Sequence, residues 1–239
     1  MSAAANTLKR LTLELGGNDA AIVLPDVDPA AIAEKIFWGA FVNNGQTCAA
    51  LKRLYVHDEI YDEVCRSLSA YAQKVVTGDG LSEDSVLGPI QNKAQFNIVS
   101  TFVDEAVQKG GRILTGGQAP SGKGNFYPVT LVADVDHGCR LVDEEQFGPA
   151  LPIIRFTTTD EVISKANSSA FGLGGSVWSK DVGKAKEIAA QLDCGTVWIN
   201  DHSAIQPIAP FGGVKQSGIG VAFGVEGLKE FTTIQTIIS

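Results

Sequence analysis

The sequence predicts an α/β fold with a largely parallel, twisted sheet flanked by helices. Apolar runs of strand length alternate along the chain with segments of helical periodicity. That alternation is typical of parallel sheets whose strands are connected through helices. Hydrophobic residues make up 44% of the 239 positions, so the chain can bury a sizeable core. We therefore expect a globular protein without disordered linkers.

The first half of the chain contains three predicted strands and three predicted helices. Gly16-Gly17 stops the first strand, and Pro25 ends the second. Asp28 is the expected N-cap of the first helix because proline follows it, Asp58 is expected to cap the second, and Gly110 is expected to close the third. The predicted strands are 11–15, 20–24 and 52–56, and the predicted helices are 30–41, the segment after Asp58, and 91–109.

The second half continues the alternation. The predicted strands are 126–135, 152–156, 176–178 and 196–199, with helices beginning at Asp160 and over 181–192. The last segment, 231–238, alternates and is rich in β-branched residues, which predicts a strand. An exposed strand of this kind is prone to aggregation, so we expect it to pair. A partner subunit and its own subunit are both possible acceptors.

Charge and cysteine usage exclude several function classes. The formal net charge is −8, which argues against a nucleic-acid module and against a polybasic membrane binder. No apolar stretch is long enough to predict a membrane-spanning helix, and the first residues lack the features of a signal peptide, so we expect a cytoplasmic protein. The four cysteines are far apart, and three histidines match no metal-binding motif. We therefore expect neither a disulfide framework nor a metal site.

Cys48 is the cysteine whose surroundings suggest chemistry. It follows the turn-forming segment 43–47 and precedes Ala49-Ala50, small residues that leave room for a substrate. A thiolate is a strong nucleophile, and a turn can aim backbone N–H groups at a developing oxyanion. The alternative is a small buried side chain, which is the expectation for Cys65 and Cys194 in helical patterns. The glycines at 172–175 and 218–220 complete no dinucleotide-binding motif and are interpreted as turns.

Two carboxylates stand at turns. Glu14 ends an apolar strand, so we expect it to be partly buried, with a pKa raised toward that of a useful general base. A structural role for Glu14 in capping backbone amides is the alternative. Glu144-Glu145 precedes a turn, and from the residues alone such an acidic pair is typical of solvated surface.

Taken together, four motifs resemble those of the aldehyde dehydrogenase superfamily. The segment 13–18, LELGGN, is similar to its glutamate motif, and 41–49, FVNNGQTCA, is similar to its cysteine motif, at the usual separation of 48 − 14 = 34 positions. The segments 144–149, EEQFGP, and 210–218, PFGGVKQSG, are similar to two further motifs of the family. Their order matches, and the resemblance extends over the whole chain.

The resemblance implies roles for named residues. Cys48 would attack the aldehyde carbon, Glu14 would activate the hydrolytic water, and the Cys48 N–H would stabilise the oxyanion. Glu145 would bind the ribose next to the nicotinamide of NAD or NADP, Phe147 would pack near the nicotinamide, and Gly16 would belong to the cofactor site. The segment 201–209 would line an aldehyde funnel that is partly apolar through Ala204, Ile205 and Ile208, which favours aliphatic or aromatic aldehydes.

The resemblance also implies an incomplete enzyme. It covers only the C-terminal half of the family's usual length, so residues 1–16 would be a remnant of the cofactor domain, 17–217 the catalytic domain, and 218–239 a return segment with an oligomerisation strand. We expect a homo-oligomer with little dehydrogenase activity by itself. Two alternatives remain open: cofactor-independent thiol esterase activity through Cys48 and Glu14, and a non-catalytic module for subunit association.

Overall fold

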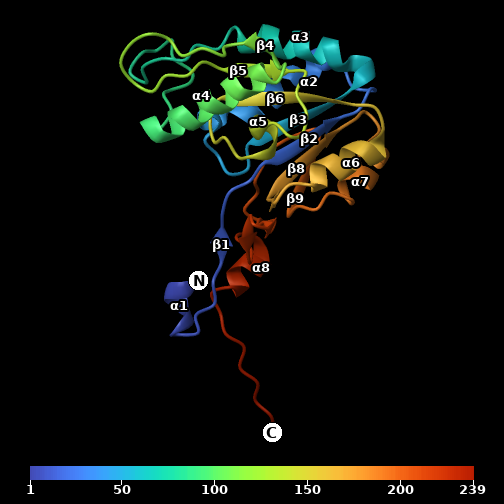
Figure 1. The fold of residues 1–239 in the computed structure, drawn as a ribbon. Coiled ribbons are helices and arrows are strands. Elements are labelled where there is room, and N and C mark those ends of the chain that lie inside the picture. Colours follow the sequence, from blue (N-terminus) through green and yellow to red (C-terminus); the bar gives the residue numbers. More distant parts are fainter.

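The computed structural model describes residues 1–239 and confirms the α/β prediction (Figure 1). Seven strands form one sheet in the order β4-β5-β6-β3-β2-β8-β9, and only the edge strand β4 is antiparallel to its neighbour. Six predicted strands appear near their expected places, whereas β4 was not predicted. The strands are β2 (Asp19–Val23), β3 (Leu51–His57), β4 (Arg112–Thr115), β5 (Thr130–Ala133), β6 (Ala150–Phe156), β8 (Gly174–Trp178) and β9 (Thr196–Ile199).

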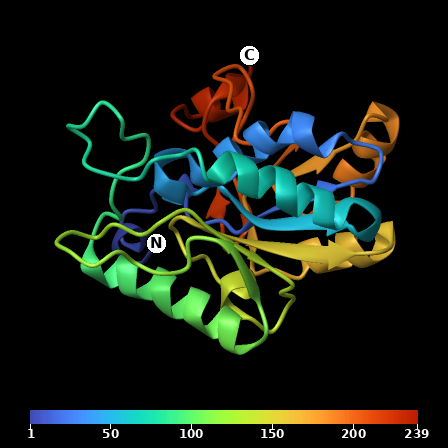
Figure 2. The same ribbon diagram turned by 90° about the horizontal axis from the view of Figure 1, so that it is seen from above.

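Helices cover both faces of this sheet. Helices α2 (Pro29–Phe41) and α3 (Tyr61–Ala72) pack on one face, and α4 (Lys93–Gln108) lies across the sheet from them (Figure 2). Side chains of β2 alternate between the two cores, since Ala21 and Val23 join the first and Ala20 and Ile22 the second. A strand buried on both faces reads as a continuous apolar run. The second face also carries α5 (Arg140–Asp143), α6 (Thr159–Asn167) and α7 (Val182–Ala189).

Two predicted helix starts, at Asp28 and Asp181, have a side-chain cap at the expected residue. Asp28 accepts a hydrogen bond from the Ala30 N–H at the start of α2. Asp181 accepts one from the Lys184 backbone N–H at the start of α7. The predicted cap at Asp58 is wrong. Asp58 begins a short 3₁₀ turn, η2 (Asp58–Ile60), because the buried Tyr61, whose hydroxyl donates to Ile153 O, sets where α3 starts.

Two other boundaries differ from prediction. The expected strand over 126–135 is reduced to β5, because residues 126–129 lead into the sheet without pairing along it. Cys194 lies in the loop between α7 and β9, not in a helix, since α7 already ends at Ala189. Propensity reasoning places element ends less well than element types, because tertiary packing sets the ends.

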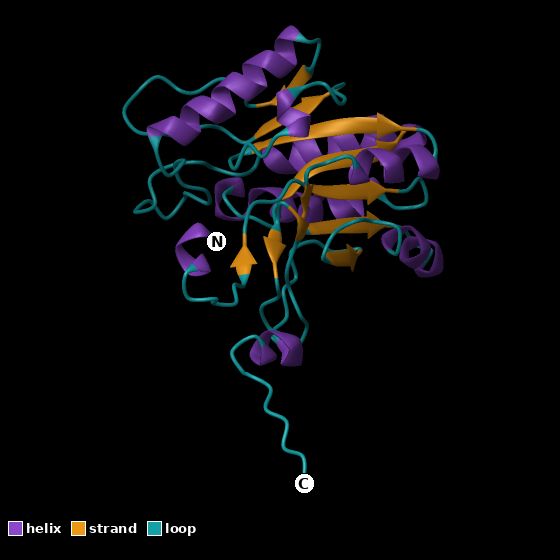
Figure 3. Ribbon diagram, turned by 60° about the horizontal axis from the view of Figure 1, so that its bottom comes forward, coloured by secondary structure: helices purple, strands orange, loops and turns teal.

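A small extension projects from one end of the α/β body (Figures 1 and 3). In it, β1 (Leu13–Glu14) pairs antiparallel with β11 (Gly218–Ile219), so only two residues of the predicted strand 11–15 are in β structure. Close to it, β7 (Phe171–Gly172) pairs with β10 (Val214–Lys215). The short helices α1 (Ser2–Ala5) and α8 (Gly224–Lys229) lie near the two ends of the chain. The 3₁₀ turn η1 (Val42–Gly45) follows α2.

The C-terminal segment 231–238 forms no strand within its own chain. Phe231, Ile234 and Ile237 are each at least 85% exposed, and the segment runs away from the body (Figure 1). Pairing inside the same subunit is therefore ruled out for this conformation, and pairing with a partner stays a prediction. No helix of the chain combines the length and apolar character needed to cross a membrane.

Candidate active site

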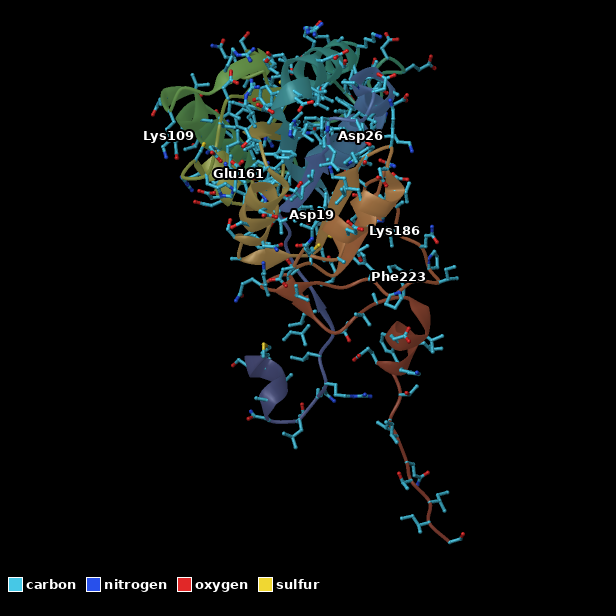
Figure 4. All side chains as sticks on the ribbon, turned by 90° about the vertical axis from the view of Figure 1, so that its right-hand side faces the viewer. Asp19, Asp26, Lys109, Glu161, Lys186 and Phe223 are labelled. Carbon is cyan, nitrogen blue, oxygen red and sulfur yellow. The ribbon has the colours of Figure 1, made fainter.

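The candidate site lies at the edge of the sheet where the parallel strands begin. The glutamate motif leads into β2, the Cys48 turn leads into β3, and the Glu145 loop leads into β6. Because β2, β3 and β6 are parallel neighbours, their amino ends meet at the same edge. Figure 4 marks Asp19, the first residue of β2, at the end of the body from which β1 leaves. The fold thus brings together three motifs that are far apart in the sequence.

Cys48 sits in a tight turn after η1. Asn43, Asn44 and Gly45 have φ values of 51°, 61° and 69°, the left-handed region that Asn and Gly tolerate best. Gly45 is required there, because a Cβ would lie 2.4 Å from the Gly148 carbonyl oxygen. The amide N–H of Cys48 donates to no group of the chain and is available for an oxyanion.

The Cys48 thiol is half-buried and lies near the carboxylate of Glu14. Burial raises the pKa of the thiol to about 12, and the nearby Glu14 carboxylate acts in the same direction. The Ala49 N–H opposes this shift only in part. At neutral pH the resting side chain is therefore a thiol with a carboxylate acceptor beside it.

The expected burial of Glu14 is wrong. Glu14 is exposed, because β1 pairs only with the two-residue β11 and lies in the extension outside the two cores. The sequence pattern could not reveal this, since an apolar run before a glycine pair is usually part of the main sheet. Glu14 nevertheless reaches Cys48, so the fold joins the two residues that the motifs singled out.

Glu145 belongs to the site and not to the solvated surface. Its Oε1 accepts the Gly17 N–H at 3.0 Å, and a Cβ on Gly16 would lie 2.4 Å from its Oε2. Burial raises the pKa of Glu145, while the Gly17 amide and the charge of Lys52 lower it. The neighbouring Glu144 is exposed and pairs with Arg140. The prediction of a solvated acidic pair is therefore confirmed for Glu144 and wrong for Glu145.

Phe147 lies two residues beyond Glu145 on the same loop. It is partly buried and has a φ of 42°, which fixes the backbone of the loop in a left-handed turn. Its expected position beside a nicotinamide stays a prediction.

Lys52 and Asp19 are charged residues that sequence reasoning missed. Lys52 is 1% exposed and donates from Nζ to Gly148 O at 2.9 Å, and burial lowers its pKa to about 7. Asp19 is equally buried, and burial raises its pKa to about 7. The sequence did contain a signal for both residues. Lys52 lies inside a predicted strand and Asp19 immediately precedes an apolar run, and charged residues in such buried positions are rare enough to indicate a site.

A pocket of about 190 Å³ lies beside the Cys48 turn. Phe211 and Trp198 line it and also belong to the small apolar cluster that contains Cys48. Ala204 and Ile205 line the pocket as the funnel prediction requires, whereas Ile208 is 85% exposed and does not. The other lining residues are Thr196, Gln206, Ala209 and Pro210.

A half-buried cysteine near a carboxylate has the residue types that covalent catalysis through a thiol requires, a nucleophile and a proton acceptor. The family model for the aldehyde dehydrogenase family matches residues 1–237 of this chain. The chain belongs to the aldehyde dehydrogenase family, whose members are oxidoreductases.

Named relatives agree with this assignment. A probable aldehyde dehydrogenase from Pseudomonas sp is 44% identical over 98% of the chain, and phenylacetaldehyde dehydrogenase from Pseudomonas fluorescens is 37% identical over 99%. Both matches cover 48% of the relative, so the chain spans about half the length of the curated relatives it matches.

Solved structures support the same family assignment. An oxidoreductase from Marinobacter aquaeolei superimposes with a TM-score of 0.95 at 38% identity, covering 99% of this chain and 49% of the other. Betaine aldehyde dehydrogenase from Staphylococcus aureus in complex with NAD+ superimposes with a TM-score of 0.91 at 37% identity, covering 97% and 47%.

Proposed function

We propose that this chain is the catalytic half of an enzyme that oxidises an aldehyde to a carboxylic acid with NAD or NADP. In this proposal Cys48 is the nucleophile and Glu14 the general base. The proximity of the Glu14 carboxylate to the Cys48 thiol is the observation that carries it, because the fold brings a proton acceptor near the thiol across 34 positions of sequence. The proposed domains are a remnant over 1–16, a catalytic domain over 17–217 and a return segment over 218–239.

The first step is addition of the thiol to the aldehyde. A sulfur–carbon bond forms, the carbonyl π pair moves to oxygen, and the thiol proton passes to Glu14. The resulting oxyanion accepts a hydrogen bond from the Cys48 N–H, which no other group uses. With NAD or NADP bound, the nicotinamide would accept the hydride lost as this oxyanion collapses, and Cys48 would be left carrying a thioester.

The second step is hydrolysis of the thioester. Glu14 accepts a proton from the attacking water, the carbon–sulfur bond breaks, and the electron pair returns to sulfur. Exposure of Glu14 suits this step, because an exposed carboxylate can pass the proton on to solvent between the two half-reactions.

The residues around Glu145 fit a dinucleotide. The Gly17 N–H fixes one carboxylate oxygen, and Gly16 leaves the space next to the other free of a side chain, so that oxygen can accept ribose hydroxyls. The nicotinamide supplies the hydride acceptor of the reaction. Glu145, Gly16 and Phe147 are the residues of this chain proposed to hold it, and the NAD+ bound to the Staphylococcus aureus relative supports this assignment.

The proposed substrate is an uncharged aldehyde with an aliphatic or aromatic side arm. The pocket beside Cys48 is lined mainly by apolar side chains, including two aromatic rings, and contains no charged residue. Charged aldehydes would lose hydration there without a compensating partner. The activity named for the phenylacetaldehyde dehydrogenase relative is consistent with such a substrate.

Steady-state formation of NADH with a panel of aldehydes tests the dehydrogenase function. We expect the 239-residue chain alone to turn over well below about 1 s⁻¹, because much of the cofactor site lies outside it. In the longer protein, Cys48→Ala should abolish turnover, and Glu14→Gln should allow a single burst of NADH followed by slow hydrolysis of the thioester. Full activity of Cys48→Ala would contradict the proposal.

The proximity of Glu14 to Cys48 also favours a second activity, cofactor-independent hydrolysis of activated esters. Attack by the thiol and deacylation by the carboxylate require no hydride acceptor. An aryl ester assay on this chain should show at least a tenfold loss in Cys48→Ala and none in Cys65→Ala, because Cys65 is buried in α3. Equal rates in all three proteins would reject the esterase, whereas the dehydrogenase proposal is tested separately by NADH formation.

A further inference from the structure

Five polar residues connect the segment before β2 to helix α5. Arg53 on β3 is 3% exposed, and its Nε donates to the backbone oxygen of Asn18 at 2.8 Å. Its Nη1 donates to the Tyr55 hydroxyl at 3.2 Å, and that hydroxyl lies 2.9 Å from His137 Nε2. His137 Nδ1 lies 3.0 Å from Oδ1 of Asp143, the last residue of α5. We call these five residues the α5 anchor.

The α5 anchor closes into a ring through the main chain. The side-chain amide of Asn18 donates to the carbonyl oxygen of Val142 at 2.9 Å, and Val142 immediately precedes Asp143. The second oxygen of Asp143 accepts the Gly138 N–H at 2.7 Å, which fixes the carboxylate beside the imidazole. Helix α5 is therefore held from two sides, and a displacement of the helix must break contacts on both.

The ends of this ring flank the hydrogen bond that fixes Glu145. Asn18 directly follows Gly17, whose N–H donates to Glu145 Oε1 at 3.0 Å. Glu145 lies two residues beyond Asp143. The donor and the acceptor of this bond are thus each attached, within two residues, to a member of the α5 anchor. If the anchor loosens, the two segments can separate, and the Glu145 carboxylate loses its fixed direction.

The contacts of His137 determine its tautomer. The Tyr55 hydroxyl accepts from Arg53, so its own hydrogen is available for donation to Nε2. The carboxylate of Asp143 beside Nδ1 favours a hydrogen on that nitrogen. Burial lowers the pKa of His137, and the charges of Asp143 and Asp136 oppose this shift only in part. Near neutral pH the ring is therefore neutral, and it accepts at Nε2.

We propose that Tyr55 and His137 are positioning residues that hold Glu145 where its free carboxylate oxygen can accept the hydroxyl groups of a cofactor. The inference rests on the proposed cofactor role of Glu145. Both residues act through α5, because the anchor fixes where this helix ends and the loop 144–149 carries Glu145 from that point.

The test is hydrogen–deuterium exchange of this 239-residue chain near neutral pH, resolved to single amides by mass spectrometry. The Gly17 amide reports on its bond to Glu145 and needs neither aldehyde nor cofactor. Tyr55→Phe keeps the buried ring but removes the hydroxyl that joins Arg53 to His137. We expect Gly17 to exchange about three- to tenfold faster in this variant, the effect of about one net hydrogen bond. Glu145→Ala removes the acceptor itself and sets the largest acceleration.

Substitutions at His137 separate positioning from packing. His137→Gln retains a side-chain oxygen that can accept from Tyr55, whereas His137→Leu supplies no acceptor. We expect most of the Gly17 protection to persist in His137→Gln and about a three- to tenfold loss in His137→Leu. A role in packing alone would not favour glutamine over leucine, because leucine buries more apolar surface.

Tyr61→Phe is the matched control. The Tyr61 hydroxyl also makes two hydrogen bonds, since it donates to Ile153 O at 2.9 Å and accepts the Asp134 N–H at 2.8 Å. Tyr61 belongs to the core on the opposite face of the sheet from Tyr55. Tyr61→Phe should therefore leave Gly17 unchanged, while the buried amides of β2 report any loss of global stability in both variants.

Two results would overturn the inference. One is an unchanged exchange rate of Gly17 in both Tyr55→Phe and His137→Leu. The other is an equal acceleration of Gly17 in Tyr61→Phe, which reports a general loss of stability. A failed assay of NADH formation would reject the proposed function without touching these exchange rates.

Discussion

Cys48 and Lys52 lie four residues apart, and burial changes the proton equilibrium of both. Burial raises the pKa of the Cys48 thiol to about 12 and lowers the pKa of the Lys52 ammonium to about 7, so in each case the neutral form is favoured. In the proposed mechanism Glu14, which lies near Cys48, accepts the proton of the thiol. Lys52 has one carbonyl acceptor and no carboxylate within salt-bridge distance. Burying its charged form therefore lowers the free energy of unfolding.

We expect the stability of the chain to depend on pH through Lys52. Below pH 7 the buried ammonium is charged in the folded and unfolded states. Between pH 7 and 10.5 the unfolded chain binds one proton more than the folded chain, so the free energy of unfolding rises with pH. Relative to Lys52→Met, the natural chain should gain about 2 kcal/mol between pH 7 and pH 9 in urea denaturation.

The control is Lys74→Met, at an exposed lysine that stays in water in both states. Its unfolding free energy should follow that of the natural chain at every pH. Parallel curves for Lys52→Met and the natural chain would show that burial does not shift the Lys52 equilibrium.

At the scale of elements, the site is built from the segments that precede strands. In open α/β sheets ligands usually bind beyond the carboxyl ends of the strands. Here the three motifs meet at the amino ends of β2, β3 and β6, and glycines allow their backbones to approach closely. Gly17 has a central place, because a Cβ there would clash with the Cys48 carbonyl and the Asp19 carboxylate, and its N–H donates to Glu145.

Gly17→Ala should therefore destabilise the fold and the site together. The added Cβ would meet backbone oxygen at 2.4 Å, and backbone cannot move aside as a flexible side chain can. We expect a loss of about 1–3 kcal/mol in chemical denaturation, with faster alkylation of Cys48 as the turn loosens. Gly80→Ala is the matched control, since no atom lies within 4 Å of its Cβ position. A Gly17→Ala variant as stable as Gly80→Ala would contradict the close approach.

At the scale of the whole molecule, the extension and the tail lie outside the packed body. The extension has little core of its own, and the segment 231–239 leaves Phe231, Ile234, Ile237 and Ile238 almost fully exposed. An unpaired apolar segment of high β propensity associates readily with another sheet edge. This supports the proposed homo-oligomer, in which the tail of one chain pairs with a second copy.

Removal of residues 231–239 should abolish association without unfolding the body. In sedimentation velocity we expect the full chain to form dimers or larger species and the shortened chain to be a monomer with an unchanged thermal midpoint. Ile234→Ser should weaken association, while Gln235→Ser at the neighbouring position should not. A monomeric full chain at all concentrations would refute this role of the tail.

The sequence by itself determined the α/β class, most strands and helices, and the residues of the motifs. These depend on local periodicity, on capping residues such as Asp28 and Asp181, and on short segments whose residue types already suit the chemistry. The apolar run over 20–23 already indicated a strand buried on both faces. The side chains of such a strand alternate between the two cores, as observed.

The tertiary structure decided burial, and with it the electrostatics of the site. Glu14 is exposed because its strand leaves the body, whereas Glu145, Lys52 and Asp19 are enclosed because three parallel strands start at the same edge. The side chains of Asp19 and His202 lie 3.7 Å apart although the residues are 183 positions apart in the sequence (202 − 19 = 183). No local pattern contains such a contact, since it arises from the order of strands in the sheet. The motifs in the sequence indicated the candidate reacting groups, and the fold determined the charges that surround them.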